Sequence, residues 1–289
     1  MEVILDTDAG FCFGVNNAID IAEKQLQDNK KTMFCIGEIV HNEAQNAILQ
    51  NKGMKTVVQD DLKHLKNAKV LIRAHGEPPQ TYKILQDNNA EIIDATCPIV
   101  KRLQEKIKKQ YADTKNTDLQ IVIFGKHNHP EVIGLLGNAD NKAVVIESSQ
   151  DFSLLDFSKP ISIYSQTTME EEKYLAIIED IRMQMLQHNN TNLFINKSVC
   201  RQVSKRVPNL RDFARQNDVI IFVAGANSSN GKYLFNVCKD VNNRSYKINA
   251  IEDIEKQWFA DAQRVGVSGA TSTPMWQMQE VAQFIRNMQ

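Results

Sequence analysis

The stretch Asp94-Ala-Thr-Cys-Pro-Ile-Val100 follows the apolar run Ile92-Ile93 and leads into a segment with helical spacing of apolar residues. Short apolar runs are typical of buried strands, and proline is favoured in the first turn of a helix, where no intrahelical N–H is needed. The sequence therefore predicts a strand that ends near Asp94 and a helix from Ile99 to about Tyr111. Cys97 would lie at the junction between them.

Two further cysteines share this position. The run Val3-Ile-Leu comes before Cys12, with a helix expected from about Val15, and Leu193-Phe-Ile comes before Cys200, with a helix expected from about Arg201. The spacing between the three cysteines is close to the length of a small α/β unit, so the pattern predicts three related modules. Their predicted bounds are 14–96, 97–197 and 198–289, with the N-terminal segment 1–13 completing the last module.

Strand and helix patterns alternate along almost the whole chain. This alternation predicts an α/β fold with mostly parallel sheets and helices on both faces, and the short strands suit small sheets. The expected strands are Val3–Asp6, Met33–Ile36, Val70–Arg73, Glu91–Asp94, Gln120–Phe124, Ala143–Ile146, Ile161–Tyr164, Leu193–Ile195, Val219–Ala224, Ser245–Ile248 and Val265–Val267.

Charge and composition limit the function. The 34 basic and 35 acidic residues leave a net charge of −1, which argues against a general nucleic-acid surface. The apolar runs are shorter than the roughly 20 residues that span a bilayer, and Met1-Glu2 does not begin a positively charged leader. We therefore expect a cytoplasmic protein with no membrane or nucleic-acid partner. Five cysteines in a chain of this size are expected to be reduced thiols.

The three junction cysteines allow three interpretations. Structural zinc sites usually draw ligands from close pairs such as C-x-x-C, and the sequence has no such pair, although a zinc site assembled in space stays open. Buried packing cysteines are the second interpretation. An iron–sulfur cluster fits the repeated position better, since three thiolates would leave one iron of a cubane cluster open to substrate. Cys35 and Cys238 lie in apolar segments, and we assign both to packing.

Polar side chains follow several other predicted strands. The carboxyl ends of parallel strands carry ligands in α/β folds, and the helices that follow attract anions with their free N–H groups. Each hydroxyl or amide is singly most often a helix N-cap, but their number favours a phosphate site. Imidazoles at the same edge could neutralise a phosphate. The residues concerned are His41, His75, His129, Ser165, Thr167, Thr168, Ser228, Ser229, Asn230, Ser268 and Ser272.

Glu131 begins a predicted helix directly after His129-Pro130. A carboxylate at this position is often a partner for the helix dipole. It could equally be a proton donor in a site. The residues alone leave both interpretations open.

Taken together, the motifs resemble those of the 4-hydroxy-3-methylbut-2-enyl diphosphate reductase family, and they occur in the family's order over nearly the whole chain. The matching stretches are Gly10-Phe-Cys12-x-Gly14-Val15, His41-Asn42, Arg73-Ala-His75-Gly76, Asp94-Ala-Thr-Cys97-Pro98, His129-Pro-Glu131-Val132, Gln166-Thr-Thr168, Asn227-Ser-Ser-Asn230 and Ser272-Thr-Pro274.

The resemblance implies a trefoil-like arrangement of the three modules around a central [4Fe-4S] cluster held by Cys12, Cys97 and Cys200. It implies reductive removal of an allylic hydroxyl in the last step of the methylerythritol phosphate route to isoprenoids, giving isopentenyl and dimethylallyl diphosphates. A ferredoxin or flavodoxin would supply the electrons, since the sequence shows no flavin or nicotinamide motif. The implied diphosphate ligands are His41, His75, Ser228, Ser229, Asn230 and Ser272; His129 also lines the pocket, Glu131 supplies protons and Thr167 positions the substrate hydroxyl.

The chain departs from the family's usual sequence at a few positions. Val203 stands where a hydroxyl residue is common, and Gly231 and Tyr233 stand where a serine and an arginine are common. Two other functions use part of the same residues. A non-redox iron–sulfur hydratase would need no electron donor, and a zinc-binding structural module would need the cysteines alone.

Overall fold

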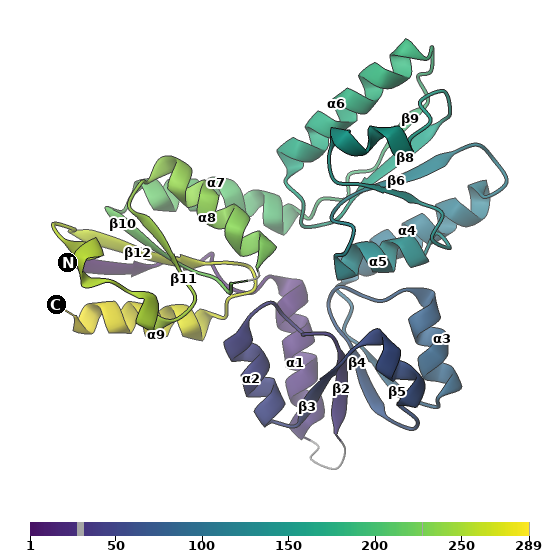
Figure 1. Ribbon diagram of the computed structural model, residues 1–289. Helices are drawn as coiled ribbons and strands as arrows, with labels where there is room; N and C mark the ends of the chain where they lie inside the picture. The colour runs from purple at the N-terminus through teal and green to yellow at the C-terminus, as the bar shows by residue number, and fades with distance from the viewer. Residues whose placement is uncertain (28–31, 227, 289) are drawn as a thin grey trace. The chain divides into compact units, whose positions relative to one another are not determined.

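The computed structural model describes residues 1–27, 32–226 and 228–288, and the side chain of Ser229 lies outside this description. Its strands form three four-stranded sheets, with order β1-β12-β10-β11, β3-β2-β4-β5 and β7-β6-β8-β9 (Figure 1). Every strand pair whose register is described is parallel. Helices follow most of the strands, so the predicted α/β class with three small parallel sheets is confirmed.

The chain divides into two compact units. The terminal unit comprises Met1–Gln27, Glu38–Met54 and Gln202–Gln289, and the central unit comprises Asp28–Gly37 and Lys55–Arg201. One sheet lies in the terminal unit, and the central unit holds the other two apart from Met54, the first residue of β3. The three predicted module bounds stay a prediction, because the sheets follow them but the compact units number two.

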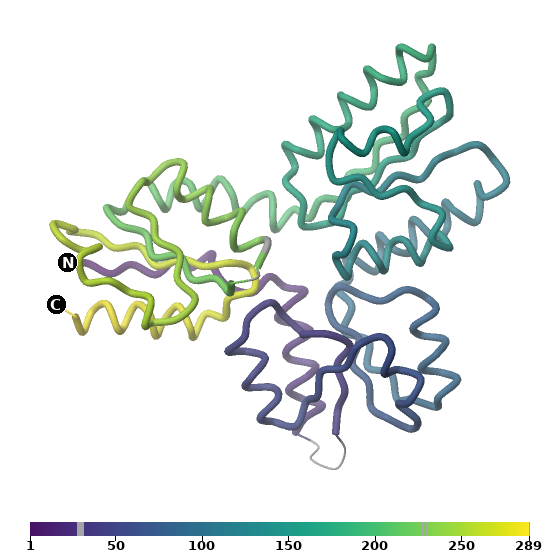
Figure 2. The backbone as a smooth tube through the Cα atoms, viewed as in Figure 1, coloured from purple at the N-terminus to yellow at the C-terminus, as the bar shows by residue number. Residues whose placement is uncertain are grey.

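The sheet of the terminal unit is packed on both faces. Both chain ends lie in this unit, where the first strand and the last helix run side by side (Figure 2). Val219, Ile221 and Val223 of β10 pack with α9 on one face, and Ile220 and Phe222 pack with α7 and α8 on the other. Such burial on both faces explains why β10 is an unbroken apolar run. The elements are β1 (Glu2–Leu5), α1 (Phe13–Gln27), α2 (Glu43–Asn51), α7 (Arg201–Arg215), β10 (Val219–Val223), α8 (Ser229–Val241), β11 (Ser245–Ile248), β12 (Arg264–Gly269) and α9 (Met275–Asn287).

The central unit repeats this design in the sheet β7-β6-β8-β9. In its second sheet, Val122 and Phe124 of β6 pack with α6, whereas Ile121 and Ile123 pack with α4 and α5 on the opposite face. The elements of the first sheet are β2 (Met33–Ile36), β3 (Met54–Val57), β4 (Lys69–Ile72), α3 (Pro79–Asp87) and β5 (Glu91–Asp94). Those of the second are α4 (Pro98–Thr114), β6 (Gln120–Phe124), α5 (Pro130–Gly137), β7 (Val144–Ile146), β8 (Ile161–Ser165), α6 (Glu171–Gln187) and β9 (Leu193–Ile195).

All the expected strands are present, with ends that match or differ by at most two residues, and β3 is an additional strand that the sequence did not predict. Met54 and Val57 are buried, while Lys55 and Thr56 between them are exposed. This pattern has neither the alternation of a half-buried strand nor the apolar run of a buried one. Since β3 is at the edge of its sheet, charged and polar side chains are tolerated there.

No helix within residues 1–27, 32–226 and 228–288 is long and apolar enough to cross a membrane.

Candidate active site

Glu131 of the central unit is held by the loop that follows a neighbouring strand. Its side chain is 1% exposed. The backbone N–H of Thr167 donates to Oε1 at 2.6 Å, and the Thr167 hydroxyl donates to Oε2 at 2.8 Å. Glu131 lies at the start of α5 after β6, and Thr167 lies just after β8, the strand paired with β6. The parallel register of these strands therefore brings the two residues together.

The environment of Glu131 favours its neutral form. Burial raises the pKa of this carboxyl group to about 7, and the two hydrogen bonds from Thr167 oppose that shift only in part. A carboxyl group with such a pKa can both donate and accept a proton near neutral pH. A group that served only as a partner for the helix dipole would be expected at the surface and ionised. The buried position favours the proton-donor interpretation.

His129 contacts both Glu131 and His75. Its Nδ1 accepts a hydrogen bond from the backbone N–H of Glu131 at 3.1 Å, which places the ring proton on Nε2. The rings of His75 and His129 meet edge to face, with centroids 5.2 Å apart. His129 thus presents its Nε2–H group as a donor.

Two of the predicted cysteine ligands are tied to this group through backbone hydrogen bonds. The N–H of Cys97 donates to the carbonyl of Ala74 at 3.0 Å, one residue before His75. The N–H of Cys200 donates to the carbonyl of Thr167 at 2.8 Å. Cys97, His75, His129, Glu131, Thr167 and Cys200 therefore form one connected set within the central unit.

The terminal unit gathers the predicted hydroxyl and amide residues. The hydroxyls of Ser228 and Ser272 are 3.1 Å apart, and both side chains are buried. Ser228 also caps α8, since its hydroxyl accepts from the N–H of Gly231 at 3.0 Å. The N-cap and the ligand interpretations of Ser228 are thus compatible. The side chain of Ser229, predicted with them, lies outside the described residues.

Asn230 presents an amide donor in this group. Its Oδ1 accepts from the N–H of Thr271 at 3.2 Å and from the Thr271 hydroxyl at 2.8 Å. Since a backbone N–H can only donate, these bonds fix the orientation of the amide and identify Nδ2 as the donor. Nδ2 is buried and finds no hydrogen-bond partner among the described residues. A buried donor of this kind needs an acceptor, which an anionic ligand would supply.

Cys12 and His41 lie in the same unit. The N–H of Cys12 donates to the carbonyl of Thr271 at 3.3 Å, so the Cys12 loop is tied to the residue that orients Asn230. The carbonyl of His41 lies against Gly225, where a Cβ atom would come within 2.8 Å of it. Glycine is therefore required for the loop before α8 to approach the His41 backbone.

The five cysteines separate into two classes. Cys12, Cys97 and Cys200 are partly exposed, whereas Cys35 and Cys238 are fully buried in β2 and α8. Burial raises the pKa of each buried thiol to about 12, so both stay protonated at neutral pH. Thiolates are the ligands of iron–sulfur clusters. The donor set at the three junctions fits such a cluster, and the two buried thiols do not.

The structure contains two buried polar groupings that the sequence did not predict. Arg206 of α7 pairs with Asp6, which follows β1, and both contact the hydroxyl of Ser268 in β12. Gln277 of α9 binds Asn42, the residue after His41. Neither grouping has a local signal, because each joins segments far apart in the sequence. Val203, a departure from the family's pattern, is buried in α7.

The fold and these residues define an α/β protein of three parallel sheets, whose strand ends carry partly exposed cysteines, imidazoles, hydroxyls and one buried acid. The chain belongs to the LytB family: the sequence model described as LytB protein matches residues 3–286. The family predicted from the motifs is thereby confirmed.

Individual relatives match this chain over most of their lengths. A 4-hydroxy-3-methylbut-2-enyl diphosphate reductase of Bacteroides fragilis is 46% identical over 288 residues, covering 99% of this chain and 98% of its own. A solved structure of (E)-4-hydroxy-3-methyl-but-2-enyl diphosphate reductase, the terminal enzyme of the non-mevalonate pathway, is 30% identical, with a TM-score of 0.76 and coverage of 99% and 100%. The Plasmodium falciparum E-1-hydroxy-2-methyl-but-2-enyl-4-diphosphate reductase, at 24% identity, supports the fold with a TM-score of 0.85 and coverage of 99% and 87%.

Proposed function

We propose that this chain catalyses the reaction for which its relatives are named, the reductive removal of the allylic hydroxyl of (E)-4-hydroxy-3-methylbut-2-enyl diphosphate. The products are isopentenyl and dimethylallyl diphosphates. Family membership supports the reaction class, and one observation in this chain carries the chemistry. Glu131 is a buried acid whose pKa is raised to about 7, and it is hydrogen-bonded to the residue that also binds the backbone of Cys200.

Family membership implies an iron–sulfur cofactor. Cys12, Cys97 and Cys200 would hold a [4Fe-4S] cluster, because they are the partly exposed cysteines and each lies directly before a helix. When bound, the cluster would supply electrons and an open iron for the substrate hydroxyl. Cys35 and Cys238, as buried neutral thiols, serve packing.

Removal of the hydroxyl consumes two electrons and two protons and releases water. Hydroxide leaves carbon poorly, so protonation of the departing oxygen lowers the barrier. Glu131 is the proton source in this proposal, and Thr167 directs the substrate hydroxyl toward it because its own hydroxyl lies 2.8 Å from the carboxyl group. The second proton goes to carbon, and addition at either end of the allylic fragment accounts for two products.

The diphosphate group anchors the substrate. Its proposed ligands are donors of several kinds: the imidazoles of His41, His75 and His129, the hydroxyls of Ser228, Ser229 and Ser272, and the amide of Asn230. The buried Nδ2 of Asn230 and the Nε2 proton of His129 support this assignment. Hydrogen bonds to an anion are roughly twice as strong as neutral ones, and anchoring fixes the hydroxyl relative to the acid.

The electrons come from outside the chain in this proposal. A ferredoxin or flavodoxin is the proposed donor. The expected cytoplasmic location stays a prediction.

An anaerobic assay tests the proposed function. Cluster-containing protein is mixed with the hydroxylated diphosphate and a reduced one-electron donor, and the organic products are identified by mass spectrometry. We expect isopentenyl and dimethylallyl diphosphates only when the reduced donor is present. A product of water loss or water addition that forms without a reductant would indicate a non-redox hydratase instead, and no conversion by a protein fully loaded with iron and sulfide would refute the proposal.

A further inference from the structure

The N-terminus of α2, directly after His41, is anchored to the N-terminus of α9. The side chain of Asn42 donates from Nδ2 to Oε1 of Gln277 at 2.9 Å, across 235 residues of sequence. Gln277 in turn donates from Nε2 to the carbonyl of Asn249 at 3.1 Å. All three residues belong to the terminal unit, and Asn42 is 4% exposed.

The donors and acceptors in this relay are fixed at every step. Oδ1 of Asn42 accepts from the backbone N–H of Gln45 at 2.9 Å and so caps α2. Since an N–H can only donate, Nδ2 of Asn42 must be the donor toward Gln277. The carbonyl of Asn249 can only accept, which fixes the amide of Gln277 in the matching orientation. A glutamine therefore satisfies both neighbours at once, and neither a carboxylate nor an apolar side chain does.

A second contact holds the same two helix ends together. The indole N–H of Trp276 donates to Oε1 of Gln45 at 3.2 Å. Gln45 and Asn46 are both buried, and Asn46 donates to the carbonyl of Val40 at 2.8 Å. The residues on both sides of His41 are thus held, Val40 at its carbonyl by Asn46 and Asn42 at its side chain by Gln277.

We propose that Gln277 is a positioning residue for the diphosphate, acting through Asn42 to fix the place of the His41 imidazole. This inference rests on the proposed function, in which His41 binds the diphosphate. Helix α9 follows directly from the Ser272-Thr-Pro274 segment, so the residue that places His41 belongs to the same stretch of chain as another proposed diphosphate ligand. The anion would therefore meet the hydroxyl and the imidazole already arranged for it, which reduces the ordering cost of binding.

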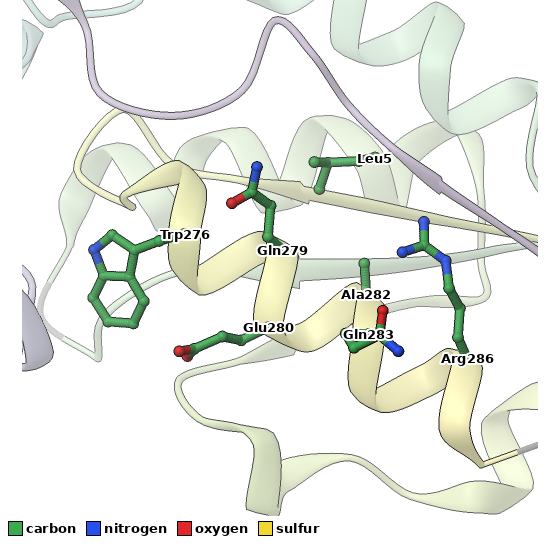
Figure 3. Close-up of a pocket in the computed structure, with 7 residues that line it drawn as sticks. All are labelled: Leu5, Trp276, Gln279, Glu280, Ala282, Gln283 and Arg286. Atoms are coloured by element: carbon green, nitrogen blue, oxygen red, sulfur yellow. The ribbon is translucent and has the colours of Figure 1, made fainter.

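Gln279 provides a matched control on the same helix. It is exposed, and it lies about 200° from Gln277 around the helix axis. There it lines an open depression of about 470 Å³ together with Trp276 and Arg286 (Figure 3). The same substitution at 277 and at 279 therefore replaces the same side chain on two different faces of α9. Only the face with Gln277 contacts Asn42.

The test is a titration of inorganic diphosphate into anaerobically purified, cluster-containing protein by isothermal calorimetry. We expect Gln277→Met and Gln277→Glu to raise the Kd about three- to tenfold, the range for losing one neutral hydrogen-bond relay. Gln279→Met and Gln279→Glu should leave the Kd unchanged. With the organic substrate, KM should rise at position 277 while kcat holds, because the weakened contact binds the diphosphate equally in the ground state and the transition state.

A double-mutant cycle distinguishes positioning from a general loss of structure. Asn42→Ser keeps an oxygen that can cap α2 but removes the donor to Gln277, so Asn42→Ser with Gln277→Met should be no worse than the poorer single variant. Additive effects would overturn the inference, as would equal Kd values for the 277 and 279 variants. If the unsubstituted protein fails to bind diphosphate, the proposed function itself fails, and this result is distinct from either of the other two.

Discussion

Oδ2 of Asp6 lies 2.8 Å from Nη2 of Arg206, and the two side chains are 7% and 6% exposed. The hydroxyl of Ser268 donates to the same carboxylate oxygen at 2.8 Å and accepts from the same guanidinium at 2.9 Å. This buried ion pair joins the segment that leads from β1 to Cys12 with α7, the helix that begins directly after Cys200.

Loss of one partner of this pair should be costly. Arg206→Met leaves the Asp6 carboxylate buried without its counter-charge, and we expect a loss of about 3–5 kcal/mol in the free energy of unfolding. The double variant Asp6→Asn with Arg206→Met removes both charges and should recover most of that loss. Urea denaturation followed by circular dichroism provides the measurement.

A control for this experiment lies on the same helix. Arg215 pairs with Asp212 at 3.3 Å, but both side chains are more than half exposed. Arg215→Met should cost at most about 1 kcal/mol, because solvent screens surface pairs. Equal destabilisation by Arg206→Met and Arg215→Met would show that the buried ion pair contributes no more to the free energy of unfolding than the exposed one.

The sequence predicted the fold wherever a strand is packed on both faces. β10 is an unbroken run of five apolar residues, and both of its faces are covered, so the pattern and the burial agree. β3 carries polar residues at its centre because an edge strand has only one neighbour in the sheet. The apolar pattern of a strand reflects how much of it is buried. An edge strand that buries few side chains therefore shows little apolar pattern in the sequence.

The residues of the candidate site were likewise predictable only in part. His129 and Glu131 could be placed together because they are adjacent in sequence at one strand end. The pairs Asn42–Gln277 and Asp6–Arg206 span 235 and 200 residues, and neither glutamine nor arginine on a helix signals a distant partner. Such pairs are decided by tertiary packing, so the residues that support a site are harder to predict than those that perform its chemistry.

The two classes of cysteine give a second prediction. Cys12→Ala, Cys97→Ala and Cys200→Ala should each lose most of the iron and sulfide, because alanine offers no ligand. Cys35→Ala and Cys238→Ala should keep both, since these buried thiols have a pKa raised to about 12 and are not thiolates. Iron and sulfide analysis with visible absorption after anaerobic purification measures the outcome. Full cluster content in Cys97→Ala would refute the ligand assignment.

Asn230→Asp gives the third prediction. The new carboxylate can still accept from the N–H and hydroxyl of Thr271, but it replaces the Nδ2 donor with a negative charge. Losing one hydrogen bond to an anion should raise the Kd for inorganic diphosphate roughly ten- to hundredfold, with repulsion adding to it. Asn243→Asp, at an exposed position after α8, makes the same charge change as a control. Similar Kd values for the two variants would remove Asn230 from the proposed ligands.

A fourth prediction concerns the stability contributed by the neutral Glu131 carboxyl group. Its folded-state pKa, about 7, lies above the ordinary value of 4.5, so folding favours the protonated form. The contribution is fully present below the ordinary pKa and is lost as pH rises through about 7. Urea denaturation at about pH 5 and about pH 8 should therefore show a drop in stability that Glu131→Gln reduces. An identical drop in both proteins would mean that other groups cause it.

The catalytic role of Glu131 is tested by the same variant. Gln keeps the size of the side chain and one acceptor oxygen for Thr167, but it has no acid proton. We expect kcat to fall about 10²–10⁴-fold, the range for losing a general acid, while the Kd for inorganic diphosphate changes little.

The pH profile of turnover gives an independent readout of that role. Because Glu131 must be protonated to act as the acid and its pKa is raised to about 7, kcat of the unsubstituted enzyme should fall above neutral pH. The fall should approach about tenfold for each further pH unit, and the residual activity of Glu131→Gln should lack it. Anaerobic stopped-flow measurements over this range, at saturating substrate and reductant, separate the two proteins. A variant that turns over within about threefold of the unsubstituted enzyme, equivalent to about 0.6 kcal/mol, would assign Glu131 to structure and require another proton source.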